Sequence, residues 1–405
     1  MFAGEWRIAA AVAWRALWSS RLLIWLCGVA SVTIWGYSSR AADFDPASLT
    51  RPYGAAGNAL VAVFARWDSV WYLAIARNGY PGADGPRTAF FPLYPLLVRA
   101  GGATPVSPLL AGALISTACF GAALVLLHRL TALELGTEAA GATVRALAFF
   151  PMAFFFSAVY SESLFLALSI GCVYAARTRR WAWAGALGAL AAATRSAGIV
   201  LVVPLVLLWL ADSRRRRIRD TLWIGLVPLG LAAFSGWLAL RGGDGGAPFH
   251  AQEVWHRHFA GPFAGLRDGA VGAFDGARQL LSGRRKPVYF TKAGGDPFTV
   301  ARTNMMLFAF ALAAVPAVVG ALRRRLPLAY GAYVVCALAL PLSWPVGPQP
   351  LMSLPRFEAV LFPLFMWLGA WSSEGGRRRE RIVLGVSAAG LVVFTALFAT
   401  WHWVA

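Results

Sequence analysis

The sequence is poor in charge, in acidic residues and in cysteine, and each shortage narrows what the protein can be. Only 14% of its 405 residues are charged, whereas 59% are hydrophobic and the mean hydropathy is +0.61. This composition excludes an ordinary soluble domain and predicts a polytopic membrane protein. The four cysteines lie far apart in apolar stretches without metal-ligand spacing. We interpret them as small buried hydrophobes rather than disulfides or ligands.

Acidic residues number 18 against 37 lysines and arginines, which leaves a formal charge of +19. Lysine itself is almost absent, with only Lys286 and Lys292, and an arginine-rich chain of this kind is typical of a high-GC bacterial genome. The basic residues form short clusters between apolar runs, as in the cytoplasmic loops of bacterial inner-membrane proteins. We therefore expect membrane lipids and no nucleic acid among the partners, and the bacterial plasma membrane as the location.

The apolar runs predict about eleven transmembrane helices in a single integral membrane domain over residues 1–405. An interfacial helix over 4–20 leads into the first apolar run, which lacks a cleavage pattern and is expected to stay as a signal anchor. The expected spans are 21–38, 106–127, 145–160, 163–177, two short ones within 181–212 separated by a break at 194–198, 221–240, 300–321, 326–343, 356–372 and 382–401.

The arginine clusters give this arrangement an orientation. Placing the N-terminus inside puts all four dense clusters, at 177–180, 214–219, 323–325 and 377–381, on the cytoplasmic side. The long polar segments then become outer loops, which we place at 39–105, with interfacial helices, and at 241–299. The turn at Tyr160–Ser163, Arg195 and the segment 344–355 share that outer side.

One outer stretch, residues 66–95 (RWDSVWYLAIARNGYPGADGPRTAFFPLYP), crowds polar, aromatic and turn residues between apolar runs. Asp68 stands between Trp67 and Trp71, and Tyr72 follows it at a spacing that shares one face of a helix. A tryptophan-rich amphipathic segment belongs at a membrane–water boundary. A carboxylate there is a candidate for chemistry on a lipid-linked substrate. The alternative is that Asp68 caps a helix starting near Ser69.

Three further charged residues are candidates for substrate contact. Glu162 stands at a span boundary, where it either contacts substrate hydroxyls or caps the next helix. Arg195 and Arg356 lie near membrane depth, away from the inner clusters, and a cation there needs a partner. A lipid-linked phosphate is one such partner, because a guanidinium grips it with two hydrogen bonds. The alternatives are ion pairs, with Glu162 for Arg195 and with Glu358 for Arg356.

The histidines of HAQEVWHRH are the one hint of a metal site. His250, His256 and His258 do not all share one helical face with metal-binding spacing. We therefore expect no metal and no cofactor, and interpret these residues as surface or acceptor contacts.

Five motifs together resemble the PIG-V family, that is, GPI mannosyltransferase 2 and its bacterial relatives among the GT-C membrane glycosyltransferases. They are RWDSVWYLAIARNGY, AFFPLYPLL, FFSAVYSESLFLAL, ATRSAG and LPRFEAVLFPLF, and they cover residues 60–210 and 350–366. The loop 241–299 matches no motif of this family. The ordered set is specific, whereas each motif alone is weak.

The resemblance implies a GT-C-type fold and transfer of mannose from a polyprenyl-phosphate donor to a lipid-linked or glycan acceptor on the non-cytoplasmic face. It implies that Asp68, in the first outer loop, is the essential acidic residue. Such a transfer, which we expect to invert the anomeric centre, passes through an oxocarbenium-like state, and one carboxylate can act as general base toward the acceptor hydroxyl. The candidate substrate-binding residues of the motifs are Arg66, Trp67, Trp71, Tyr72, Tyr94, Tyr160, Glu162, Arg195 and Arg356.

The rival interpretation is a transporter or flippase of polyprenyl-linked lipids. Transporters often contain repeats with paired broken helices. This chain shows no convincing internal repeat, two unequal outer loops and a single acidic motif. These features favour the enzyme.

Overall fold

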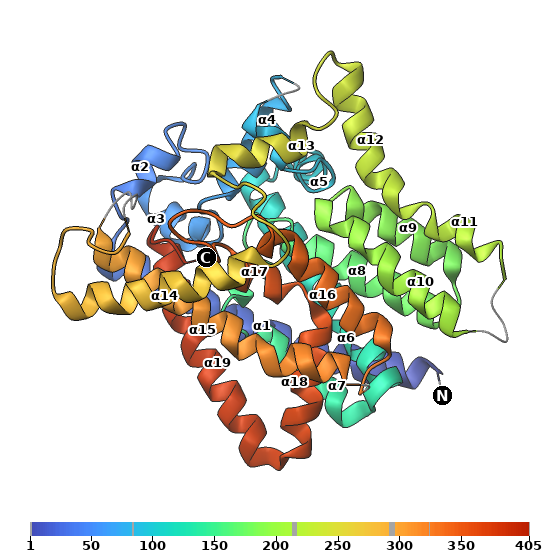
Figure 1. Cartoon of the computed structure of the whole chain (residues 1–405). Coiled ribbons are helices and arrows are strands. Elements are labelled where there is room, and N and C mark those ends of the chain that lie inside the picture. Colours follow the sequence, from blue (N-terminus) through green and yellow to red (C-terminus); the bar gives the residue numbers. More distant parts are fainter. Residues whose placement is uncertain (1, 83–84, 213–216, 291–295, 324, 405) are drawn as a thin grey trace.

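The computed structural model describes residues 2–82, 85–212, 217–290, 296–323 and 325–404. This part of the chain folds into α-helices and short 3₁₀ helices without a β-strand (Figure 1). The prediction of an all-α protein is therefore confirmed.

Five helices within the described ranges are long and apolar enough to cross a membrane, and three shorter apolar helices accompany them. The long ones are α1 (Phe2–Trp35), α6 (Pro108–Leu135), α11 (Asp220–Ile224) continued by α12 (Val227–Leu240), α15 (Pro297–Leu322) and α19 (Gly376–Ala399). The shorter ones are α9 (Trp181–Ala192), η4 (Ser196–Leu201) continued by α10 (Val202–Ala211), and α16 (Leu328–Leu342). They make this an integral membrane protein, whereas the number of eleven spans is not confirmed.

The remaining helices are short. In the first outer segment they are α2 (Arg40–Phe44), α3 (Gly54–Leu60), η1 (Ala62–Phe64), α4 (Ser69–Asn78), η2 (Pro86–Ala89) and α5 (Leu93–Gly102). In the second they are α13 (Ala247–His250), η5 (Ala251–Trp255) and α14 (Ala264–Ser282). Elsewhere they are α7 (Thr137–Ala148), η3 (Ala153–Phe156), α8 (Glu162–Arg177), α17 (Leu354–Ala359) and α18 (Phe362–Glu374).

The first helix differs from the expectation of an interfacial helix followed by a separate span. α1 is continuous from Phe2 to Trp35. No glycine or proline stands between Gly4 and Gly28, so nothing in this stretch interrupts the helix. The tryptophans that suggested an interfacial helix, Trp14 and Trp18, lie exposed on the same continuous helix.

Two other expected spans are divided by proline. The prediction of a span at 145–160 is wrong. Helix α7 ends at Ala148 and an irregular segment with η3 follows, because Pro151 cannot continue a helix. The span at 356–372 is split into α17 and α18, and Pro363 stands in the first turn of α18, where proline is tolerated. The expected break at 194–198 is confirmed, since α9 ends at Ala192 and η4 begins at Ser196.

Helix α8 forms the middle of the bundle. It packs between α6 and α9 (Figure 1), and nearly every residue from Glu162 to Ala176 is buried. A helix that is apolar on all sides belongs in the interior of the protein. α8 therefore fixes the place of its N-terminal residue, Glu162, beneath the surface.

The arginine-bearing helix ends gather at one end of the bundle, where ion pairs join them. Arg177 at the end of α8 pairs with Glu134 at the end of α6, and Arg325 before α16 lies 2.8 Å from Glu374 at the end of α18. The opposite ends of these helices, including Glu162 at the start of α8, therefore lie away from these arginine clusters. Of the clusters named above, residues 214–216 and 324 lie outside the described residues.

Candidate active site

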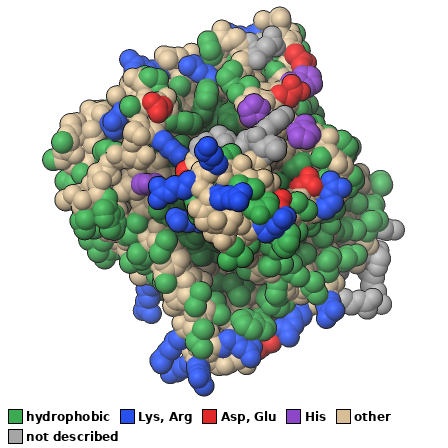
Figure 2. Space-filling view, turned by 60° about the vertical axis from the view of Figure 1, so that its left-hand side comes forward, with side chains coloured by type: hydrophobic (Ala, Val, Ile, Leu, Met, Phe, Trp, Pro, Cys, Tyr) green, Lys and Arg blue, Asp and Glu red, His purple; other side chains and the backbone are tan. Residues whose placement is uncertain are grey.

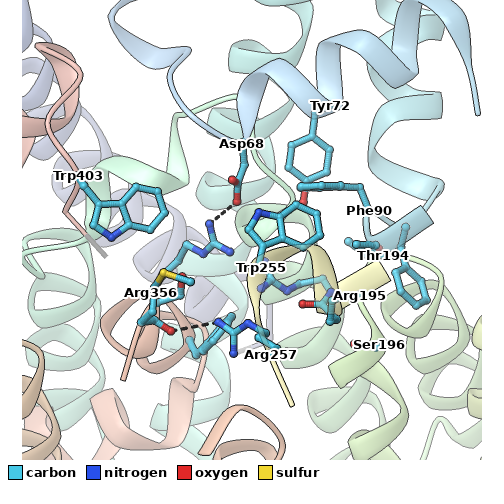
Figure 3. A pocket seen from close by; sticks show the side chains of 16 residues that line it. Asp68, Tyr72, Phe90, Thr194, Arg195, Ser196, Trp255, Arg257, Arg356 and Trp403 are labelled. Atoms are coloured by element: carbon cyan, nitrogen blue, oxygen red, sulfur yellow. Dashed lines mark hydrogen bonds and ion pairs between the residues drawn. The ribbon is translucent and has the colours of Figure 1, made fainter. Parts of the chain in front are cut away.

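A polar cavity of about 150 Å³ opens at the bundle end opposite the arginine clusters. Its walls come from segments far apart in sequence: the start of α4, the break between α9 and η4, η5, α17 and the last residues of the chain. Figure 3 shows Asp68, Arg195, Arg257 and Arg356 around this space. The fold thus places an acid among three arginines in a cavity open to a ligand.

Asp68 occupies the N-cap position of α4, but its side chain makes no capping hydrogen bond. Its Oδ2 accepts a hydrogen bond of 2.6 Å from Nη1 of Arg356 instead. Trp67, just before it, has a φ of +51°, a conformation uncommon for a bulky residue, and packs against Phe44, Trp401 and Trp403. This turn directs the carboxylate across the cavity rather than over the helix end.

The backbone of Asp68 is fixed as well. Its N–H donates a 3.0 Å hydrogen bond to Oη of Tyr160, and that hydroxyl donates to the carbonyl of Arg66 at 3.2 Å. Tyr160 is fully buried and also contacts Tyr72 and Phe155 through its ring. One phenol therefore holds both sides of the turn that carries the acid.

Four charged side chains form a continuous network. Arg356 reaches Asp68 through Nη1 and lies 3.2 Å from Oε1 of Glu162 through Nε, and the same Oε1 is paired with Nη1 of Arg195. The side chains of Asp68 and Arg356 are 17% and 15% exposed, whereas Glu162 is 1% exposed. A ligand can therefore reach Asp68 and Arg356, while Glu162 acts from below by neutralising the arginines.

This network bears on two of the alternatives drawn from the sequence. Arg195 has the ion pair with Glu162 that was the alternative to phosphate binding, yet it also lines the cavity. Arg356 is paired with Asp68 and Glu162 rather than with Glu358. Burial acts to lower the pKa of the Arg356 guanidinium, but Asp68 and Glu162 raise it above its ordinary value, so this residue stays charged.

Arg195 reaches the cavity because the chain breaks between α9 and η4. Gly198 lies so close to α9 that an added Cβ would stand 2.3 Å from the backbone nitrogen of Ala192. Only glycine permits this approach, which brings the start of η4 against the end of α9. The residue between the two helices, Arg195, then points into the polar space (Figure 3).

Arg257 is a cavity residue that the sequence analysis missed. It stands between the two histidines of HRH, and its Nη1 and Nη2 donate 3.2 Å hydrogen bonds to the carbonyls of Trp344 and Met352. Burial, aided by Arg356, lowers the pKa of Arg257 to about 10, so the guanidinium is still charged at neutral pH. None of the ion pairs found in the described ranges includes it. An arginine set apart from the cytoplasmic clusters was the signal available in the sequence.

A second, apolar cavity of about 340 Å³ adjoins the polar one. Its walls include Phe165, Leu231, Phe249, Tyr333 and Leu340, from α8, α12, α13 and α16. The two cavities share Arg195, Ser196, Gln252, Arg257 and Phe357. A charged neck bearing two arginines thus lies between a polar and an apolar space.

The other candidate residues fall into two groups. Tyr72 lines the polar cavity, and Trp71 stands behind it, packed against Phe90 and Trp255, which do line it. Tyr160 supports Asp68 without lining the space, as described above.

Three candidates lie apart from both cavities. Arg66 is completely buried, and its guanidinium donates to the carbonyls of Ala62, Ala65 and Ala399, which ties the first outer segment to the end of α19. Tyr94 is buried and bonds to Ser116. Trp67 likewise has its ring buried in an aromatic cluster, so all three side chains are engaged in packing contacts within the protein.

The histidines do not meet at a metal site. His250 bonds to Asp244 at 2.6 Å, and none of the three histidines lines the polar cavity. A search of the described part of the chain finds no group of three or more His, Cys, Asp or Glu residues placed to hold a metal ion.

Comparison with known proteins gives one family match and several distant structural likenesses. Residues 18–210 match the model of the family described as mannosyltransferase (PIG-V). A search of the curated proteins gives no match.

The similar solved structures are all of an oligosaccharyltransferase from Archaeoglobus fulgidus. The apo form has a TM-score of 0.44 at 13% identity over 95% of this chain and 56% of that one. The form tethered to an acceptor peptide has a TM-score of 0.43 at 12% identity and covers 95% of this chain and 55% of that one. The complex with zinc and sulfate has a TM-score of 0.42 at 13% identity and covers 82% of this chain and 48% of that one. The chain therefore spans about half the length of these structures.

The matched residues 18–210 include the turn that carries Asp68, the start of α8 with Glu162, and the break that carries Arg195. The segments with Arg257 and Arg356 lie beyond the match. The similarity to the PIG-V mannosyltransferase family therefore rests on residues 18–210, which are just under half of the chain.

Proposed function

We propose that this glycosyltransferase transfers a mannosyl residue from polyprenyl-phosphate-mannose to a hydroxyl of a lipid-linked or glycan acceptor, with inversion, on the non-cytoplasmic face of a bacterial plasma membrane. The observation that carries the proposal is the charged neck between the two cavities. Arg195 and Arg257 lie where the polar space with Asp68 meets the apolar space. A donor made of a sugar, a phosphate and a hydrocarbon chain has these three parts in this order.

The apolar cavity suits the first isoprenyl units of the donor. Its walls are aromatic and aliphatic side chains, such as Phe165, Leu231 and Leu340, and it is the larger of the two spaces. Ligand sites of this type bury apolar groups and orient them with a few polar contacts. The phosphate would then reach the neck, where the guanidinium groups of Arg195 and Arg257 offer paired donors.

The charges around the polar cavity favour a phosphodiester over a diphosphate. Arg195, Arg257 and Arg356 face the carboxylates of Asp68 and Glu162, which leaves one uncompensated positive charge. A sugar phosphodiester carries one negative charge and neutralises it. A diphosphate linkage would add a second negative charge to a partly buried site, where an unpaired charge is costly.

Asp68 would act as the general base of a single displacement. The acceptor oxygen attacks the anomeric carbon, the bond from that carbon to the phosphate oxygen breaks, and the hydroxyl proton passes to Asp68. The bond to Arg356 uses Oδ2, so we assign Oδ1 as the proton acceptor. The polyprenyl phosphate leaves with an added negative charge, which Arg195 and Arg257 stabilise. One displacement inverts the anomeric centre, and the rings of Phe90 and Trp255 offer a face to the sugar.

The rival transporter is less well supported. Transporter sites form near the bilayer midplane between repeats, where broken helices face each other. Here the charged residues lie at helix ends on one side of the bundle, and one of them is an acid suited to take a proton.

The test is transfer by the purified protein in phosphatidylcholine vesicles. Donors with one phosphate and with a diphosphate are offered in parallel, each with a panel of glycan and lipid-linked acceptors. We expect mannose transfer from the monophosphate donor alone, with inverted configuration in the product by NMR. Movement of labelled donor across the vesicle membrane without any transfer would support the transporter and overturn the proposal.

A further inference from the structure

Helix α14 carries exposed apolar side chains although it is not suited to cross a membrane. Phe274 is 65% and Leu281 88% exposed, and Val271 and Leu266 lie on the same outward side. α14 is not among the membrane-spanning candidates of the described chain, since glycines and charged residues interrupt its apolar positions. A helix of this amphipathic kind lies along a membrane surface rather than across it.

The opposite side of α14 is packed, so its exposed side has a fixed direction. Gly265 lies against the carbonyl of Leu342, Gly269 against Leu351 and Gly276 against Ala301. These contacts join α14 to α15, to the end of α16 and to the segment before α17. Because that segment leads into Arg356, α14 lies on the same side of the protein as the polar cavity (Figure 1).

A basic turn follows α14. Arg284, Arg285 and Lys286 are all exposed, and within the described ranges no ion pair engages them. The turn is held by Gln279, which is completely buried: its Nε2 donates to the carbonyls of Arg284 and Lys286, and its Oε1 accepts from the N–H of Val288. The three cations are therefore presented by a folded turn. Figure 2 shows lysine and arginine side chains gathered among hydrophobic ones on this face of the molecule.

We propose that α14 and the turn 283–288, here called the α14 surface, bind the anionic phospholipid headgroups of the membrane leaflet on the side of the cavity. Phe274 and Leu281 would enter the boundary between headgroups and acyl chains, and the three cations of the turn would contact lipid phosphates. Basic residues attract anionic lipids when they stand beside apolar side chains that reach the bilayer. This inference is independent of the proposed donor and of Asp68.

The test places a reporter on the α14 surface of the full-length protein. The four native cysteines are replaced by alanine, Leu281→Cys is labelled with an environment-sensitive dye, and the protein is reconstituted with lipids brominated on their acyl chains. The vesicles contain phosphatidylcholine alone or mixed with phosphatidylglycerol. We expect quenching of the dye in both, deeper with phosphatidylglycerol, and a return to the phosphatidylcholine level at high salt because ions screen the headgroup contacts.

The charge of the turn is then removed with Arg284→Gln, Arg285→Gln and Lys286→Gln together. These side chains are exposed, so thermal unfolding should not change, while the effect of phosphatidylglycerol on quenching should be lost.

The matched control removes the same charge at the opposite end of the bundle, with Arg377→Gln, Arg378→Gln and Arg381→Gln, all exposed in α19. It should leave the quenching unchanged. An unquenched dye in every vesicle would overturn the proposal. Equal quenching with and without phosphatidylglycerol would also overturn it, since the contact would then be apolar alone.

Discussion

Asp68 and Arg356 form an ion pair of 2.6 Å although 288 residues separate them in the chain. The same guanidinium lies 3.2 Å from Glu162, so one arginine is shared by an acid that faces the cavity and an acid buried beneath it. The arrangement sets the position of the Asp68 side chain through a partner at the far end of the sequence. Arg356 is therefore proposed to orient the base, while Arg195 and Arg257 hold the donor phosphate.

The first prediction concerns Arg356. Arg356→Lys keeps the positive charge but presents it at a single point, which cannot hold Asp68 and Glu162 together. We expect kcat to fall about tenfold, equivalent to roughly 1.4 kcal/mol, while donor affinity stays near that of the native protein. The measurement is kcat alongside donor binding by isothermal titration. A large loss of donor affinity with unchanged kcat would assign Arg356 to the phosphate instead.

The second prediction concerns the neck between the cavities. Arg195→Lys and Arg257→Lys should each weaken donor binding by about tenfold or more, because a hydrogen bond to a charged group contributes roughly 1.5–3 kcal/mol. Because both variants keep the positive charge, the salt dependence of donor binding should stay near that of the native protein. Arg267→Lys is the matched control, since Arg267 belongs to the same outer segment but is exposed and pairs with Asp268. If both neck variants bind donor as the control does, the phosphate lies elsewhere.

The third prediction concerns Glu162. Glu162→Gln keeps the shape of the side chain but leaves Arg195 and Arg356 without a shared counter-ion in a largely buried place. We expect a loss of about 1–3 kcal/mol in the free energy of unfolding. A double variant with Arg195→Gln should recover part of this loss, because the uncompensated charge is removed. Additive losses in the double variant would show that the two residues are not coupled.

The fourth prediction concerns the support beneath Asp68. Tyr160→Phe removes the hydroxyl that joins the N–H of Asp68 to the carbonyl of Arg66, and it keeps the ring contacts. We expect stability to fall by about 1 kcal/mol and activity to fall less than in any variant of Asp68. Thermal unfolding and transfer assays on the same preparation decide this. A loss as large as that of Asp68→Asn would mean that the phenol takes part in the chemistry.

Short-range patterns in the sequence indicated several parts of this candidate site. The chain break around Arg195 follows from a polar residue between apolar runs, and the start of α4 at Ser69 follows from the residues around Asp68. The segments that gave the family resemblance also supply Glu162 and Arg356. These features depend on neighbours in sequence, so the sequence can indicate them.

Features that depend on distant contacts could not be found in this way. Arg66 and Arg195 look alike in sequence, yet Arg66 is enclosed by backbone carbonyls that include Ala399, and only folding reveals it. Arg257 stands between two histidines in the sequence, and nothing in this local pattern indicates a binding residue. Its place in the site depends on the two cavities, whose walls it forms together with segments elsewhere in the chain. The end of α7 at Ala148 was missed because apolar residues on both sides of Pro151 conceal the break.

The last prediction separates catalysis by Asp68 from a structural role, and it needs a control carboxylate. Asp45 lies in the same outer segment and is completely buried, and its two oxygens accept hydrogen bonds from the N–H groups of Leu49 and Thr50 and from the hydroxyl of Thr50. Asp45→Asn should lower the temperature of unfolding and leave transfer per folded molecule near normal.

Asp68→Asn should keep the unfolding temperature of the native protein and lose most of the mannose transfer. Asparagine keeps the size of the side chain and can still accept the hydrogen bond from Arg356, so folding and donor binding should be preserved. It cannot take the proton of an acceptor hydroxyl, and a lost general base commonly lowers the rate by a factor on the order of 10² to 10⁴. The measurement is mannose transfer by purified Asp68→Asn and Asp45→Asn, with thermal unfolding and donor binding of each. Near-normal transfer by folded Asp68→Asn would remove Asp68 from the mechanism, because the variant lacks both the negative charge and the basicity of the carboxylate.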